Sequence, residues 1–152
     1  VSINYLENNY DYSSYHIVGI SGGGWTATLA GALDDRILQT YSIAGSYPFF
    51  LRSDPENFGD YEQHNLELYQ KSNYLDLYVM ASIGDERKFI QIFNKYDPCC
   101  FGGDSFQKYE NDVKNVVKKI GKGSFDIYLD DSHKEHIISD YALEIIISEI
   151  SA

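Results

Sequence analysis

A serine stands in a glycine-rich turn between a short apolar run and a segment with helical spacing. The turn reads Gly19-Ile20-Ser21-Gly22-Gly23, the apolar run is residues 17–20, and apolar side chains recur at helical spacing between Trp25 and Leu33. A turn this tight forces its central residue into a strained backbone conformation, and it needs small residues two positions before and after. It lifts the Ser21 hydroxyl above the sheet edge, beside the backbone N–H of Gly22, which would form half of an oxyanion hole. We therefore predict that Ser21 is a nucleophile for acyl transfer.

The glycines of this turn do not fit the two common phosphate-binding patterns. A dinucleotide fingerprint reads Gly-x-Gly-x-x-Gly, but Ser21 occupies the position of its second glycine after Gly19. A Walker loop ends in Gly-Lys-Ser/Thr, whereas Gly24 is followed by Trp25 and Thr26. The glycines therefore expose a serine and do not cradle a phosphate.

Strands and helices alternate along the chain and must position this serine. Buried-strand patterns are predicted for residues 17–20, 37–44, 89–93 and 125–129. Helical spacing is found at residues 25–33, at 109–120 before Gly121, in part of 53–78, and after a cap at Ser139 or Asp140. Because helices connect the strands, the crossover connections imply an α/β fold with a mostly parallel sheet and flanking helices.

This order of elements resembles the α/β-hydrolase family over essentially the whole chain, and the serine turn is its most specific part. In that fold an acid follows the next strand but one after the serine, and a histidine follows the last strand. The resemblance implies a single, partial α/β-hydrolase domain over residues 1–152, with no cofactor and no metal.

The resemblance leaves two candidates for the acid. Asp97 follows the strand predicted over residues 89–93, and its surroundings NKYDPCCF are similar to the Asp-Pro turn that presents the acid in the family. Asp85, in the sequence SIGDERK, is the alternative if residues 77–83 form the relevant strand. We favour Asp97.

Two histidines compete for the role of general base. His136 begins the sequence HIIS, which fits the family's His-x-(Ile/Val)-Ser/Pro pattern at the mouth of the last helix. His133 lies three residues earlier and is the alternative. We favour His136.

The resemblance also implies how these groups would act. His136 would take the proton of Ser21, Asp97 would fix the histidine tautomer, and the Gly22 N–H would bind the oxyanion. The expected reaction is hydrolysis of a small-molecule ester or related acyl bond through an acyl-serine intermediate. A serine peptidase of the same fold and a non-catalytic binding module are the alternatives.

An aromatic segment, residues 45–63, occupies the position of the family's variable cap. Its Tyr and Phe side chains would pack together or wall an apolar pocket, and Arg52 would meet a substrate carboxylate.

Composition excludes several partners. The chain has 152 residues, 43% of them hydrophobic, which suffices for one domain with a core. Its net charge of −11 repels a phosphate backbone, so nucleic acid is not an expected partner. The apolar runs, such as residues 145–147, are too short to span a membrane. Cys99 and Cys100 are adjacent, which is not metal-ligand spacing and does not link distant segments.

Few residues precede the strand that leads into the serine turn. The family fold has several strands there, and a loop among them supplies the second oxyanion N–H, but residues 1–15 are too few to form them. We therefore expect this chain to be the C-terminal half of a larger hydrolase domain, with the strand at 17–20 as an open sheet edge. The missing N-terminal half or another copy would pair along that edge.

Overall fold

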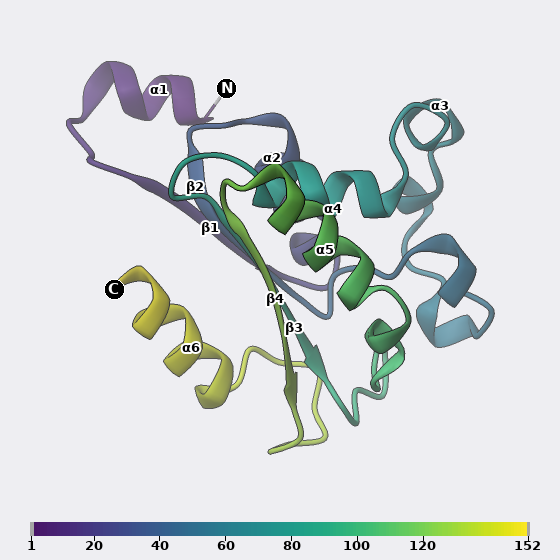
Figure 1. The fold of residues 1–152 in the computed structure, drawn as a ribbon. Helices are drawn as coiled ribbons and strands as arrows, with labels where there is room; N and C mark the ends of the chain where they lie inside the picture. The colour runs from purple at the N-terminus through teal and green to yellow at the C-terminus, as the bar shows by residue number, and fades with distance from the viewer. Residues whose placement is uncertain (1, 152) are drawn as a thin grey trace.

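The computed structural model describes residues 2–151 and contains a four-stranded parallel sheet with helices on both faces (Figure 1). The strands lie side by side in chain order: β1 (Tyr15–Ile20), β2 (Ile37–Ile43), β3 (Lys88–Asn94) and β4 (Ser124–Asp130). The register aligns Ile20 with Ile43 and Ile43 with Ile92. The carboxyl ends of the strands therefore meet at one edge of the sheet, as the predicted crossovers require.

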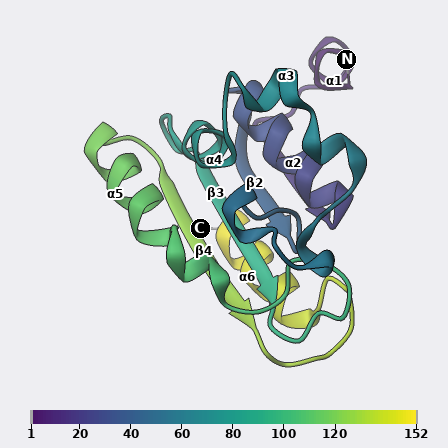
Figure 2. The same ribbon diagram turned by 90° about the vertical axis from the view of Figure 1, so that its right-hand side faces the viewer.

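Three helices cover one face of the sheet and one helix covers the other. α2 (Gly22–Leu33), α4 (Tyr74–Ser82) and α5 (Glu110–Ile120) share a face, whereas α6 (Asp140–Ile150) lies on the opposite face (Figures 1 and 2). Within β3, Phe89 and Phe93 are buried on the three-helix side, and Ile90 and Ile92 are buried with α6. This alternation follows the period of two of a strand, and it explains why β3 has apolar residues on both of its faces.

The connection between β2 and α4 contains short helical turns and one small helix. These are η1 (Phe49–Leu51), η2 (Pro55–Asn57), η3 (Tyr61–His64) and α3 (Leu66–Tyr69). Tyr47 and Leu51 from this connection are buried in the core of the three-helix face, together with Tyr74, the first residue of α4. Full burial of such a side chain contributes about 1.5–3 kcal/mol.

Residues 77–83, considered above as a strand, belong mainly to the helix α4. Asn73 caps this helix, because its side-chain oxygen accepts the N–H of Leu75 at 2.8 Å and of Asp76 at 3.2 Å. The Asp76 carboxylate in turn accepts the N–H of Asn73 at 2.9 Å and completes a capping box. The alternative of a strand at 77–83 is therefore wrong, and Asp85 follows a helix.

β1 is one of the two edge strands of the sheet, and β4 is the other. Within residues 2–151 β1 pairs only with β2, and Val18 on it is partly exposed. The helix α1 (Ser2–Asn9) precedes β1 (Figure 1). It contributes no buried residue. None of the helices described has both the length and the apolar character needed to cross a bilayer.

Candidate active site

Ser21 occupies the turn between β1 and α2 in a strained conformation, as the sequence predicts. Its φ of 56° and ψ of −127° lie outside the regions that a non-glycine residue readily adopts, which costs about 1–3 kcal/mol. Two backbone hydrogen bonds hold the turn: Ser21 N–H donates to Ile43 O at 2.9 Å, and Trp25 N–H donates to Ser21 O at 3.0 Å. The turn is therefore tied to both the neighbouring strand and the first turn of α2.

Two glycines make this turn sterically possible, and only one of them was predicted. A Cβ on Gly19 would collide with the carbonyl group of Gly23 and lie 2.8 Å from the backbone nitrogen of Gly24. A Cβ on Gly23 would meet nothing within 4 Å, so the expectation that this residue must be small is wrong. The close contact lies one residue later, because a Cβ on Gly24 would lie 2.8 Å from the Cα of Gly45. The helix thus approaches the end of β2 at Gly24.

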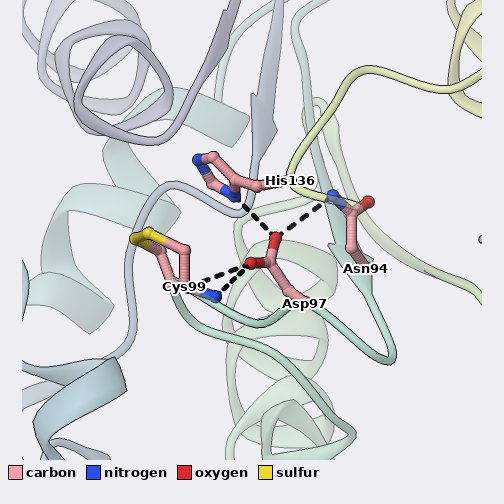
Figure 3. The surroundings of a disulfide bond; sticks show 5 residues. Asn94, Asp97, Cys99 and His136 are labelled. Atoms are coloured by element: carbon pink, nitrogen blue, oxygen red, sulfur yellow. Dashed lines mark hydrogen bonds and ion pairs between the residues drawn. A yellow bond between two sulfur atoms is a disulfide. The ribbon is translucent and has the colours of Figure 1, made fainter. Parts of the chain in front are cut away.

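Asp97 and His136 form a hydrogen-bonded pair beyond the ends of β3 and β4 (Figure 3). His136 Nδ1 lies 2.7 Å from Asp97 Oδ2, and the Asp97 carboxylate is 0% exposed whereas the His136 side chain is 24% exposed. The other carboxylate oxygen, Oδ1, accepts the backbone N–H of Cys99 at 2.8 Å and of Cys100 at 3.0 Å. The carboxylate thus holds the proton on Nδ1 and leaves Nε2 as the basic nitrogen.

Asn94 links the two partners, and the sequence analysis did not identify it. Its side-chain amide donates to Asp97 Oδ2 at 3.3 Å (Figure 3). It also donates to the carbonyl of Ile137 at 3.0 Å. Asn94 is the last residue of β3 and is buried. It therefore joins the acid turn to the residue after His136, and its position at the end of β3, three residues before Asp97, was the available signal.

The alternative base, His133, has a different partner. His133 Nε2 lies 3.1 Å from Asp130 Oδ2, and the buried Asp130 carboxylate also accepts hydrogen bonds from Ser132 and Ser139. Burial by itself would raise the pKa of Asp130, but these hydrogen bonds and the charge of His133 outweigh it and lower the pKa. Ser139 is also the N-cap of α6. The hydrogen bond between Asp130 and Ser139 therefore joins the two ends of the loop of residues 130–139, which contains His136.

The alternative acid, Asp85, lies on the surface. Its side chain is 79% exposed and forms an ion pair with Lys122 at 3.0 Å. It follows α4 instead of a strand of the sheet. In the structure Asp97, and not Asp85, contacts a histidine.

Ser21 and His136 both lie beyond the carboxyl ends of the strands, but no hydrogen bond joins their side chains in the described part of the chain. His136 Nε2 is buried and has no hydrogen-bond partner within residues 2–151. The base position thus keeps a free nitrogen, and catalytic hydrogen bonds often tighten only when substrate binds.

The cap segment, residues 45–63, is organised by Arg52. The guanidinium donates to the carbonyls of Tyr47 at 2.6 Å and Phe58 at 2.9 Å and to Gln63 Oε1 at 3.0 Å. It also lies 4.4 Å from the centre of the Tyr74 ring, and the residue is only 7% exposed. The expectation that Arg52 meets a substrate carboxylate does not fit this burial, because Arg52 instead ties the segment together.

The same segment reaches the serine turn through Asp60. One Asp60 carboxylate oxygen would lie 3.1 Å from a Cβ on Gly22. The sequence analysis did not identify this contact. It places a negative charge beside the residue whose N–H is the expected oxyanion donor.

Cys99 and Cys100 form a disulfide with each other, directly after the Asp-Pro turn (Figure 3). Their adjacency in the sequence did not predict this pairing. Both sulfur atoms and a ring nitrogen of His136 lie within 4.8 Å of one another.

Comparison with solved structures identifies the fold. The chain is similar to a promiscuous CE15 esterase from a marine bacterial metagenome, with 12% identity and a TM-score of 0.68 over 99% of this chain and 45% of that chain. The chain has the fold of a portion of an α/β-hydrolase. A glucuronoyl esterase from Solibacter usitatus matches with 16% identity and a TM-score of 0.67, over 99% of this chain and 45% of that one.

An acylaminoacyl peptidase from Pyrococcus horikoshii shares the same α/β-hydrolase architecture. It matches with 20% identity and a TM-score of 0.60, over 98% of this chain and 26% of that chain. The chain therefore spans less than half the length of these three proteins. No protein-family model matches the chain, and no curated protein sequence does.

Proposed function

We propose that the chain carries the nucleophile, base and acid of a serine hydrolase that cleaves esters. The observation that carries this proposal is the 2.7 Å contact between His136 and the buried Asp97, at the sheet edge where Ser21 stands in a strained turn. A carboxylate, a histidine with a free Nε2 and a serine at an α/β-hydrolase turn are the parts that acyl transfer requires.

In the proposed mechanism the Ser21 hydroxyl attacks the carbonyl carbon of the ester while His136 Nε2 takes its proton. Asp97 stabilises the imidazolium that results, and His136 then gives the proton to the departing alcohol. Water repeats the sequence on the acyl-serine and restores the enzyme. Each step uses the tautomer that the Asp97 contact selects.

The oxyanion of the tetrahedral intermediate would bind at the start of α2. The N–H of Gly22 is one of the unpaired donors at this helix N-terminus, where the helix dipole favours negative charge. One such donor contributes about 10²–10³ in rate in other enzymes. The charge of Asp60 beside Gly22 would disfavour anionic substrates and favour neutral or cationic ones.

A serine peptidase of the same fold is the second candidate, supported by the similarity to the acylaminoacyl peptidase. We favour an esterase because two of the three compared structures are esterases. We also propose that a further strand, from a preceding segment or another copy, pairs with the open edge of β1.

A substrate panel tests this function. We expect the purified protein to hydrolyse chromogenic short-chain esters faster than peptide anilides, and Ser21→Ala to lose at least about a thousandfold in kcat. Faster cleavage of the anilides would favour the peptidase. Ester hydrolysis that survives in Ser21→Ala would contradict the proposal.

A further inference from the structure

The disulfide between Cys99 and Cys100 lies against the pair of His136 and Asp97 (Figure 3). Both sulfur atoms and a ring nitrogen of His136 lie within 4.8 Å of one another. Adjacent cysteines rarely bind the same metal ion, but this turn places both sulfurs on the side that faces His136. Cys99 is an exposed residue and Cys100 is partly exposed, so the disulfide lies at the protein surface, where a reductant can approach it.

Reduction would convert these sulfurs into metal ligands. A dithiol reductant supplies two electrons and two protons, breaks the S–S bond to give two thiols, and is itself oxidised to a disulfide. Two thiolates and a neutral imidazole are the donors that Zn²⁺ and similar soft cations prefer, and binding releases the two thiol protons. Tetrahedral zinc places such donors about 3.5–3.8 Å apart, within reach of small side-chain movements from the present spacing.

The surroundings of His136 match those of a metal-bound histidine. Nδ1 is engaged by the Asp97 carboxylate, so Nε2, which is buried and without a partner among residues 2–151, is the nitrogen left to coordinate. A carboxylate on the far ring nitrogen fixes the tautomer and raises the basicity of the ligating nitrogen. The same carboxylate fixes the backbone of Cys99 and Cys100 through their N–H groups.

We propose that the reduced protein binds a soft divalent cation, such as Zn²⁺ or Cd²⁺, through Cys99, Cys100 and His136. This differs from the sequence-based expectation of no metal. A cation on Nε2 prevents His136 from accepting the serine proton, so the metal inhibits hydrolysis; this second part rests on the proposed function. The disulfide form lacks thiolate ligands and stays insensitive to the metal.

The binding test uses Cd²⁺ as the probe and the thiolate-to-cadmium absorption band in the ultraviolet as the readout. We expect the reduced protein to bind one Cd²⁺ with this band, and the oxidised protein to show none. The matched control is the Cys99→Ala/Cys100→Ala variant, which keeps both backbone N–H bonds to Asp97 and removes only the sulfurs. It should show no band.

Two further variants test the histidine and its carboxylate. His136→Ala should weaken Cd²⁺ binding at least about tenfold, and Asp97→Asn should weaken it about 10–100-fold, as loss of such carboxylate partners does elsewhere. Absence of the band in the reduced wild type, or unchanged affinity in both variants, would overturn the proposed site.

Ester hydrolysis separates this inference from the proposed function. Zn²⁺ should inhibit the reduced wild type, a chelator should restore it, and the double alanine variant should be insensitive. A cadmium band in a protein without hydrolase activity would retain the metal site and refute the proposed function. Hydrolase activity in a reduced protein that shows no cadmium band would retain the proposed function and refute the metal site.

Discussion

Gly19→Ala is expected to disturb the serine turn through a single methyl group. The added Cβ would collide with the Gly23 carbonyl and lie 2.8 Å from the Gly24 nitrogen, and both neighbours are backbone atoms that cannot rotate away. Overpacking costs about 1–3 kcal/mol, and a backbone collision belongs at the upper end. The alanine also lowers the conformational entropy of the unfolded chain, which stabilises the folded state by about 0.4–1 kcal/mol. We therefore expect a net loss of about 2 kcal/mol in the free energy of unfolding.

Gly23→Ala is the matched control, four residues away in the same turn. Its Cβ would meet nothing within 4 Å, so this variant should be neutral or more stable by up to about 1 kcal/mol. Urea unfolding measures both free energies, and in a thermal scan each kcal/mol corresponds to about 2–4 °C for a protein of this size. Equal stability of the two variants would refute the view that Gly19 makes room for the serine turn.

Two other variants test the network around the site. Arg52→Lys keeps the charge, but one ammonium cannot reach all the acceptors of the guanidinium, among them the carbonyls of Tyr47 and Phe58. We expect a loss of about 1–3 kcal/mol in urea unfolding; unchanged stability would mean that Arg52 does not hold the cap segment. The lowered pKa of Asp130 means that its stabilisation is complete above the ordinary value of 3.8 and is lost as the pH falls below it. Asp130→Asn should therefore be less stable at neutral pH and lose less stability between about pH 5 and pH 3, and parallel pH profiles for variant and wild type would contradict this.

The order of the strands could be predicted because each strand contains an apolar run or an apolar alternation, whereas the helix α1 was not predicted. The prediction located all the strands of the sheet within two residues at either end, and Gly121 ends α5 with a φ of 81° as expected. The alternative strand at 77–83 is wrong because these residues belong mainly to a capped helix. The pair Asn73 and Asp76, three residues apart, was the local signal for a helix.

The contacts across the sheet edge could not be predicted from local patterns. Asn94 bonds to a carbonyl more than forty residues away, and the role of Arg52 depends on how residues 45–63 fold back on Tyr74. The direction in which α2 leaves the sheet determines which position has no room for a side chain. In the structure this position is Gly24, not Gly23 as predicted. Motif order predicted the candidate site residues, whereas long-range packing determines what holds them.

The central claim is that His136, held by Asp97, activates Ser21. Labelling with a fluorophosphonate probe, followed by mass spectrometry of the modified peptide, tests it most directly. We predict an adduct on Ser21 whose rate of formation falls at least about a hundredfold in His136→Ala, while His133→Ala retains most of it. An adduct on another residue, or equal labelling of His136→Ala and the wild type, would contradict the claim.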